Sequence, residues 1–123
     1  MESIKLYHKS VFWEKRFNVE ALEIMKSAER SKHFSKHLIN DRLQKDKNRQ
    51  FTTKDILTAL QNHGYIFEVE TKNNKVTKCC IRFNFTDNKD LIVVCRENII
   101  VTAWTCRKYD THKTLDISKY ATA

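Results

Sequence analysis

The chain of 123 residues contains a single glycine and no proline. Because glycine and proline build most tight turns, flexible linkers and phosphate-binding loops, their scarcity argues against a many-turned β-sandwich, a disordered linker and a glycine-rich nucleotide site. The sequence also lacks any apolar run approaching roughly 18 residues, and its first residues, MESIKLYHK, have no apolar signal-peptide core. We therefore expect no membrane span, no membrane partner and no classical secretion.

The four cysteines lack the spacing of a zinc site or a redox pair, since no CxxC motif or Cys/His zinc spacing is present. Each lies in an apolar run typical of a strand, where a free cysteine behaves as a small buried hydrophobe. They are Cys79, Cys80, Cys95 and Cys106. Free thiols in a folded core are typical of a reducing compartment, so we expect a cytoplasmic protein. We also expect no metal and no cofactor.

Positive charge exceeds negative charge by a wide margin. Lysine and arginine total 23, aspartate and glutamate total 15, and the formal net charge is +8. No separate basic tail accounts for the excess, which favours a partner that is itself polyanionic: RNA, DNA or an acidic protein. The alternative is that the charge serves solubility alone.

The length predicts one domain over residues 1–123. Apolar residues recur at helical spacing over Val19–Arg30, with Asn18 as N-cap, and over Thr53–His63, which ends at the only glycine, Gly64. From Ser31 or Ser35 we expect the helix to reopen or to continue through the stretch that ends at Arg42. Within the domain we expect a lead-in of uncertain structure, a helical part, an antiparallel sheet and a tail, over residues 1–18, 19–63, 65–106 and 107–123. In the lead-in, Ser3–Tyr7 is compatible with a short strand or with part of a helix.

After residue 64 the apolar period changes to two, which is typical of strands. The turn signals at residues 72–75 and 87–90 separate the first three of four strands. Leu91–Cys95 is apolar throughout, as expected of a central strand covered on both faces. Short connections favour antiparallel neighbours. The predicted fold is therefore an α+β fold with two or three N-terminal helices followed by a four-stranded antiparallel sheet.

The stretch Ser31–Arg42, SKHFSKHLINDR, contains the most distinctive side chains. His33 and His37 are four residues apart, and Asp41 and Arg42 follow. On a helix the two imidazoles would share one face, beside a fixed cation. Titratable imidazoles and a cation are what proton transfer on an anionic substrate requires. The pair is also compatible with an ordinary exposed surface, or with a metal site completed by Asp41 or His112.

Several short motifs follow one another in a recognisable order. They are Ser31-Lys32-His33-Phe34, the helix in Thr52–Leu60, Arg82 in a strand, and Ile100-Val101-Thr102-Ala103-Trp104. This order, over residues 31–106, resembles the RelE/barnase/colicin-like group of small ribonucleases, in particular an uncharacterised bacterial and phage branch. That branch tends to have arginine one turn after its histidine, where this chain has His37.

The resemblance implies a metal-independent RNA endonuclease, acting as a toxin or phage effector, with an antitoxin, immunity protein or host protein as a further partner. Such cleavage needs a base, an acid and cations that stabilise charge on phosphorus. His33 and His37 are the candidate base and acid, Arg82 is the candidate phosphate ligand, and Thr102 would hold a phosphate oxygen or orient a histidine. The candidate RNA-binding residues are Arg42, Lys78, Trp104, Tyr109 and His112.

The same residues have structural interpretations. Arg82 could pair with Glu68 or Glu70 across the hairpin, and Thr102 and Trp104 could serve packing alone. The alternative function is a non-catalytic basic binding module for nucleic acid or for an acidic protein partner, such as a phage-encoded inhibitor of a host enzyme. Convergence of the two histidines, Arg82 and Thr102 on one open surface would favour the enzyme.

Overall fold

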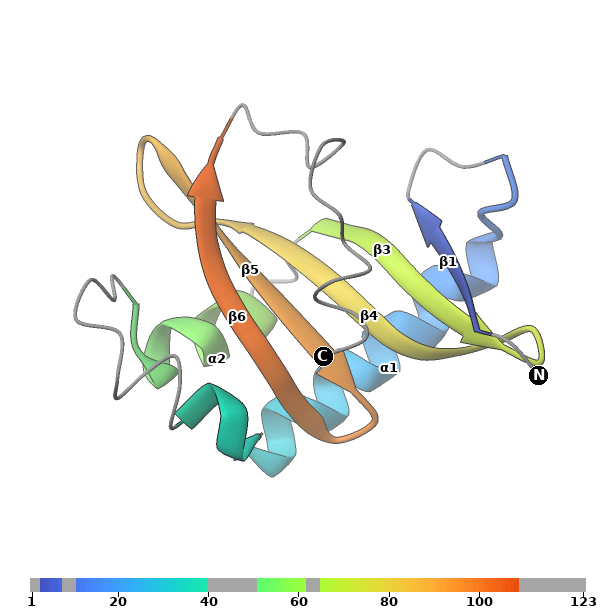
Figure 1. Ribbon diagram of the computed structural model, residues 1–123, viewed down its shortest axis with the longest axis horizontal. Coiled ribbons are helices and arrows are strands. Elements are labelled where there is room, and N and C mark those ends of the chain that lie inside the picture. Colours follow the sequence, from blue (N-terminus) through green and yellow to red (C-terminus); the bar gives the residue numbers. More distant parts are fainter. Residues whose placement is uncertain (1–2, 8–10, 40–50, 62–64, 109–123) are drawn as a thin grey trace.

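In the computed structural model, a six-stranded sheet carries two helices on one of its faces (Figure 1). The structure describes residues 3–7, 11–39, 51–61 and 65–108. The strand order is β1-β3-β4-β5-β6-β2. In chain order the elements are β1 (Ile4–Tyr7), α1 (Lys15–Ser31), β2 (His33–Phe34), α2 (Thr53–Gln61), β3 (Tyr65–Lys72), β4 (Lys75–Asn84), β5 (Lys89–Arg96) and β6 (Ile99–Arg107).

The predicted fold, N-terminal helices followed by a four-stranded antiparallel sheet, is wrong. The sheet is mixed and has six strands, because two strands of the N-terminal half join its edges. β1 pairs antiparallel with β3, and β2 pairs parallel with β6. Strands of four and two residues are too short to show an apolar period, and their pairing partners lie far along the chain. Strands β3 to β6 pair antiparallel with their sequence neighbours.

Helix α1 packs along the sheet through residues spaced at helical intervals. Phe17, Ala21, Met25 and Ala28 are all buried, which is the stripe expected of an amphipathic helix. The helix begins at Lys15 rather than at Val19, so the predicted start and the predicted N-cap are wrong. Asn18 lies inside the helix, where its side-chain oxygen accepts a hydrogen bond of 3.3 Å from the Trp13 indole.

Helix α1 ends at Ser31 and does not continue into the stretch that contains the two histidines. Lys32 adopts a left-handed conformation with φ of 52°, and its N–H donates to the carbonyl of Ala28. A residue in this conformation terminates a helix, because the next residue cannot continue the helical turn. His33 and Phe34 then form β2. The prediction of a helix that continues or reopens at Ser31 is therefore wrong, whereas a helical turn does reopen after Ser35, over residues 36–39. Residues 40–42 lie outside the described residues.

Helix α2 begins with a reciprocal cap. The Thr52 N–H donates to the Asp55 carboxylate at 2.8 Å, and the Asp55 N–H donates to the Thr52 hydroxyl at 3.3 Å. Two backbone donors that have no partner within the helix are thereby satisfied. The helix is described to Gln61, and the predicted end at His63 and Gly64 lies outside the described residues.

Replacing Thr52 with alanine should lower the free energy of unfolding by about 1 kcal/mol, because the cap loses its hydroxyl acceptor. Thr53→Ala is the matched control, since it removes the same group one residue later and leaves both cap hydrogen bonds in place. Urea unfolding followed by circular dichroism measures both variants. An equal loss in the two would contradict the cap.

The sheet has one face under the helices and a second face opposite them. Val69, Cys79 and Cys95 stand opposite one another on neighbouring strands and belong to the core beneath the helices. Because side chains alternate along a strand, the intervening positions point away from the helices. This second face carries Phe67, Glu68, Lys78, Cys80, Arg82, Ile92, Val94, Thr102 and Trp104.

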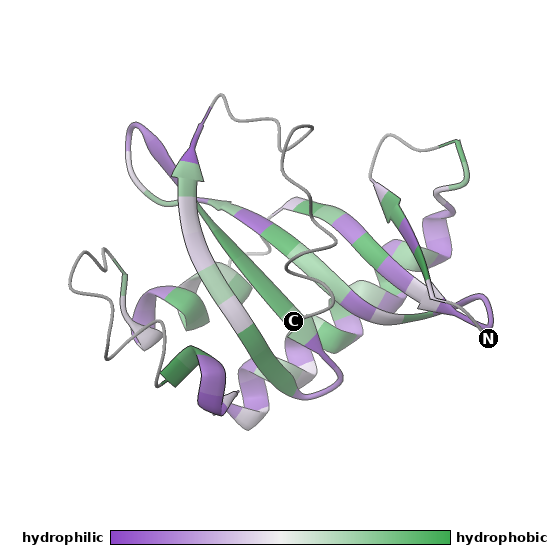
Figure 2. Ribbon diagram, viewed as in Figure 1, coloured by the Kyte–Doolittle hydropathy of each residue, from purple (hydrophilic) through white to green (hydrophobic). Residues whose placement is uncertain are grey.

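Strand β5 lies inside the sheet and is buried on both faces, which confirms the prediction for Leu91–Cys95. Figure 2 shows β5 hydrophobic in its middle and hydrophilic at both ends, whereas β3 and β4 alternate between hydrophilic and hydrophobic residues. Among the described residues, no helix is both long enough and apolar enough to cross a bilayer.

Candidate functional site

Four of the predicted site residues lie on the second face. Arg82 on β4 stands opposite Ile92 on β5, which stands opposite Trp104 on β6. Thr102, two residues before Trp104 on β6, stands opposite Val94 on β5. Lys78 belongs to the same face at the level of Arg96. The period-two pattern of the strands therefore brings Lys78, Arg82, Thr102 and Trp104 to one side of the sheet.

His33 lies at a corner of the sheet, far from Arg82. It is on the edge strand β2, opposite Ile99 of β6, and its neighbour Phe34 packs toward the helices. Strands lie about 4.8 Å apart and advance about 3.3 Å per residue. In register, His33 is three strands away from Arg82 and five residues further along β6. Their Cα atoms are thus separated by about 20 Å, too far for one phosphate to touch both side chains.

His37 belongs to a different element from His33. Residues 36–39 are helical, and Ser35 starts this turn by accepting a hydrogen bond of 3.1 Å from the Leu38 N–H on its hydroxyl. The same hydroxyl donates to the Val101 carbonyl of β6 at 2.6 Å. His37 is therefore exposed beside the edge of the sheet, and the predicted shared helical face of the two histidines is wrong. Arg42, Tyr109 and His112 lie outside the described residues.

Arg82 is committed to neighbouring groups. Its Nε lies 2.7 Å from a carboxylate oxygen of Asp90, and both side chains are 15% exposed. Its Nη2 donates to the carbonyls of Arg107 and Lys108, each at 3.0 Å. The sequence suggested Glu68 or Glu70 as partner, whereas Asp90 on the next strand fills this role. These contacts tie β4 and β5 to the end of β6.

Glu68 is a buried carboxyl that the sequence prediction passed over. It is 5% exposed and stands opposite Cys80. Its pKa is raised from 4.5 to about 7, chiefly by burial. The nearby Glu70 carboxylate contributes to the rise, while Lys5 and Lys78 oppose it. Among the described residues, no hydrogen bond to its carboxyl is present. The signal was available, because Glu68 stands between two apolar strand residues and opposite an apolar position.

Lys78 and Thr102 are polar groups that share this burial. Each is 5% exposed. Burial lowers the pKa of Lys78, and the positive charges of Arg96 and Lys5 lower it further, while Glu70 and Glu68 raise it. The Thr102 hydroxyl oxygen is buried and has no hydrogen-bond partner in the described part of the chain. A buried polar atom without a hydrogen-bond partner costs free energy. The second face therefore lacks a hydrogen-bonding group at Thr102 among the described residues.

Exposed positive side chains gather where α1 ends and the sheet edge begins. We call this surface the basic edge; it consists of Arg30, Lys32, His33, Lys36 and His37, all exposed. No acidic residue occurs between residues 30 and 39. Within the described ranges, Arg30, Lys32 and Lys36 form no ion pair. The basic edge is thus a local excess of accessible positive charge.

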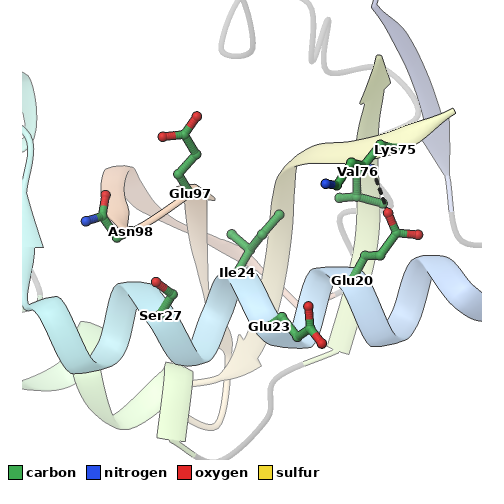
Figure 3. Close-up of a pocket in the computed structure, with 8 residues that line it drawn as sticks. All are labelled: Glu20, Glu23, Ile24, Ser27, Lys75, Val76, Glu97 and Asn98. Atoms are coloured by element: carbon green, nitrogen blue, oxygen red, sulfur yellow. Dashed lines mark hydrogen bonds between the residues drawn. The ribbon is translucent and has the colours of Figure 1, made fainter. Parts of the chain in front are cut away.

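A hollow of about 400 Å³ has the opposite character (Figure 3). It lies between α1, the start of β4, where Lys75 lines it, and the turn that joins β5 to β6. Glu20, Glu23 and Glu97 bring three carboxyl groups to it, and Glu20 accepts a hydrogen bond of 3.1 Å from the Val76 N–H. These carboxylates disfavour a polyanion. Among the described residues, no group of three or more His, Cys, Asp or Glu could hold a metal ion.

Comparison of the chain with known protein families, with curated proteins and with solved structures finds no match to any of them.

Proposed function

We propose that this protein is a nucleic-acid-binding module whose basic edge contacts the phosphates of RNA. The observation that carries the proposal is the exposed cluster of Arg30, Lys32 and Lys36, with two imidazoles among them and no acidic residue between positions 30 and 39. Such a cluster releases condensed counterions when it replaces them on a phosphate backbone, which drives binding without any requirement for sequence.

The stability of the fold does not account for this cluster. A cation near the C-terminus of a helix interacts favourably with the helix dipole, and Arg30 in the last turn of α1 meets that need. Lys32 and Lys36 lie beyond the helix end and are exposed. Their positive charge is therefore available to an external anion.

Cleavage of RNA is a separate prediction. It required His33 and Arg82 to meet at one phosphate, but Arg82 is bound to Asp90 and to two carbonyls about 20 Å away. We therefore propose binding, and not cleavage, for the basic edge. The binding experiment described next also tests for cleavage, and it tests whether an acidic protein is the partner in place of RNA.

Removing three charges from the basic edge should weaken RNA binding strongly. We expect Arg30→Gln/Lys32→Gln/Lys36→Gln to reduce affinity for a labelled single-stranded RNA at least about tenfold at low salt. The slope of log affinity against log salt concentration should fall by about 2, since each phosphate contact on a single strand contributes about 0.7. Fluorescence anisotropy in EDTA across a salt series measures both quantities.

The matched control is Lys15→Gln/Lys54→Gln/Lys72→Gln, which removes the same charge from exposed positions away from the basic edge. An equal loss of affinity in this control, or no binding of RNA at low salt, would overturn the proposal, and the second result would favour an acidic protein. The RNA recovered from the same samples is examined on a gel. Cleavage in EDTA that disappears in His33→Ala or His37→Ala would replace the proposal with the ribonuclease.

A further inference from the structure

The apolar part of the second face is buried, yet no described element covers it. Cys80, Ile92 and Val94 are at most 4% exposed. They form a cluster separate from the core beneath the helices, and α1 and α2 both lie on the opposite side of the sheet (Figure 1). Apolar side chains in the middle of a sheet face are buried only when another layer packs on them.

The end of β6 is held toward this face. Arg82, which belongs to the second face, donates from Nη2 to the carbonyls of Arg107 and Lys108. The Lys108 N–H donates to the Asn88 carbonyl at 3.3 Å, and its ammonium group lies 3.5 Å from the Asp90 carboxylate. These contacts hold Lys108 beside Arg82 and Asp90, at the ends of β4 and β5.

We propose that the C-terminal segment, residues 109–123, docks on the second face of the sheet. The segment lies outside the described residues, and its sequence is YDTHKTLDISKYATA. Its apolar residues, Tyr109, Leu115, Ile117 and Tyr120, provide the layer that the face requires. Fifteen residues reach about 50 Å when extended, whereas the strands from β3 to β6 span only about 14 Å across the sheet.

The other undescribed segments fit this position less well. Residues 40–50 connect the helical turn at residues 36–39 to Phe51 and α2, and Leu38 and Phe51 are both buried in the core beneath the helices. Residues 62–64 connect α2 to β3 and are too few to cross a sheet. Residues 109–123 are more numerous and directly follow the anchored residue Lys108.

Polar groups of the second face also need a partner. The Thr102 hydroxyl oxygen is buried and has none in the described part of the chain, and Glu68 is buried without a described hydrogen bond. The two residues occupy one cross-strand row, Glu68–Cys80–Val94–Thr102. Backbone N–H and C=O groups of a segment laid along this row can satisfy both, because every residue except proline carries one donor and one acceptor.

The docked segment gives Lys78, Thr102 and Trp104 a role within the fold. These residues, predicted to bind RNA or to act in catalysis, would lie beneath the segment and would not reach a nucleic acid. The basic edge is made of other residues, so failure of the docking proposal leaves the RNA-binding proposal unaffected.

Thiol labelling tests the docking, because the cysteines report on both faces. Cys80 lies on the second face, and Cys95 lies in the core beneath the helices and serves as internal reference. In the full chain, Leu115→Asp/Ile117→Asp should increase the rate at which a maleimide labels Cys80 at least about tenfold and leave Cys95 unchanged. Fragmentation mass spectrometry distinguishes Cys80 from its neighbour Cys79.

The matched control is Val11→Asp/Val19→Asp, which introduces the same charges at positions that are 91% and 59% exposed and should leave Cys80 protected. Arg82→Lys keeps the positive charge but loses the guanidinium that holds both carbonyls, and it should raise labelling of Cys80 to a smaller extent. The proposal fails if Cys80 labels rapidly in the unmodified chain, or if neither variant changes its rate. It also fails if protection of Cys80 depends on protein concentration, which would indicate a second copy as the cover.

Discussion

Replacing Arg82 with alanine is expected to lower the free energy of unfolding by about 3 kcal/mol. The substitution leaves the Asp90 carboxylate, which is 15% exposed, without its nearest cation, and it removes the donor to two backbone carbonyls. Losing one member of a mostly buried ion pair costs more than the pair contributes, because the remaining charge stays poorly solvated. Lys108, at 3.5 Å from Asp90, compensates only in part.

Urea unfolding of Arg82→Ala, Asp90→Ala and the double variant Arg82→Ala/Asp90→Ala measures this coupling. The double variant should lose less stability than the two single variants lose together, since it removes both members of the Arg82–Asp90 pair and leaves neither without the other. Arg96→Ala, at an exposed position on β5, is the control and should change the free energy of unfolding by less than about 0.5 kcal/mol. A loss for Arg82→Ala no larger than that of the control would show that the ion pair does not hold the sheet together.

This expectation affects how any activity assay is interpreted. Arg82 was the predicted phosphate ligand, and an inactive Arg82→Ala protein would seem to support that role. Because the same substitution disrupts the junction of β4, β5 and β6, lost activity must be compared with the stability of the variant before it is attributed to the site.

Glu68→Gln is expected to stabilise the protein by about 3 kcal/mol at pH 8 and to have almost no effect at pH 4. The pKa of Glu68 is raised from 4.5 to about 7 in the fold, chiefly by burial. Below pH 4.5 the carboxyl is protonated in both states and carries no electrostatic penalty. Between pH 4.5 and 7 the unfolded chain releases the proton while the fold retains it, so stability falls as pH rises. Above pH 7 the penalty is complete and constant.

Glutamine has the shape of a protonated glutamate and does not titrate, so the variant should lose this part of the pH dependence. The free energy of unfolding is measured at intervals from pH 4 to 8 for the wild type and for Glu68→Gln. Glu23→Gln, which removes an exposed carboxylate from α1, is the matched control and should follow the wild-type profile. Parallel profiles for the wild type and Glu68→Gln would contradict the raised pKa.

Local patterns predicted those elements that a single stretch of sequence can encode. The apolar run Leu91–Cys95 identified a strand buried on both faces, and α2 begins at the predicted Thr53 because Thr52 and Asp55 form its cap. The sequence left β1 open between a short strand and a helix, and β2 escaped prediction because so few residues show no period. The pairing of both strands depends on strands that follow much later in the chain. The fold class was wrong for this reason.

The candidate site divides in the same way. Lys78 and Arg82, and Thr102 and Trp104, share parity within their strands, so their common face follows from the alternation of side chains. The separation of His33 from His37 could not be predicted from the sequence pattern. It depends on the left-handed conformation of Lys32 and on the hydrogen bonds of Ser35 to β6. The sequence suggested two acidic partners for Arg82, both on β3. The ion pair with Asp90 instead depends on the register between β4 and β5.

The pairing of β2 with β6 also makes the arrangement of the basic edge depend on residues that lie far along the chain. His33 and Phe34 are held by Ile99 and Ile100, and Ser35 is held by the carbonyls of Ile100 and Val101. Closing so long a stretch of chain costs more entropy than closing a hairpin, so this edge forms late in folding and opens early in unfolding. Residues up to 101 must therefore be present before Lys32, His33 and Lys36 acquire the arrangement that they have in the fold.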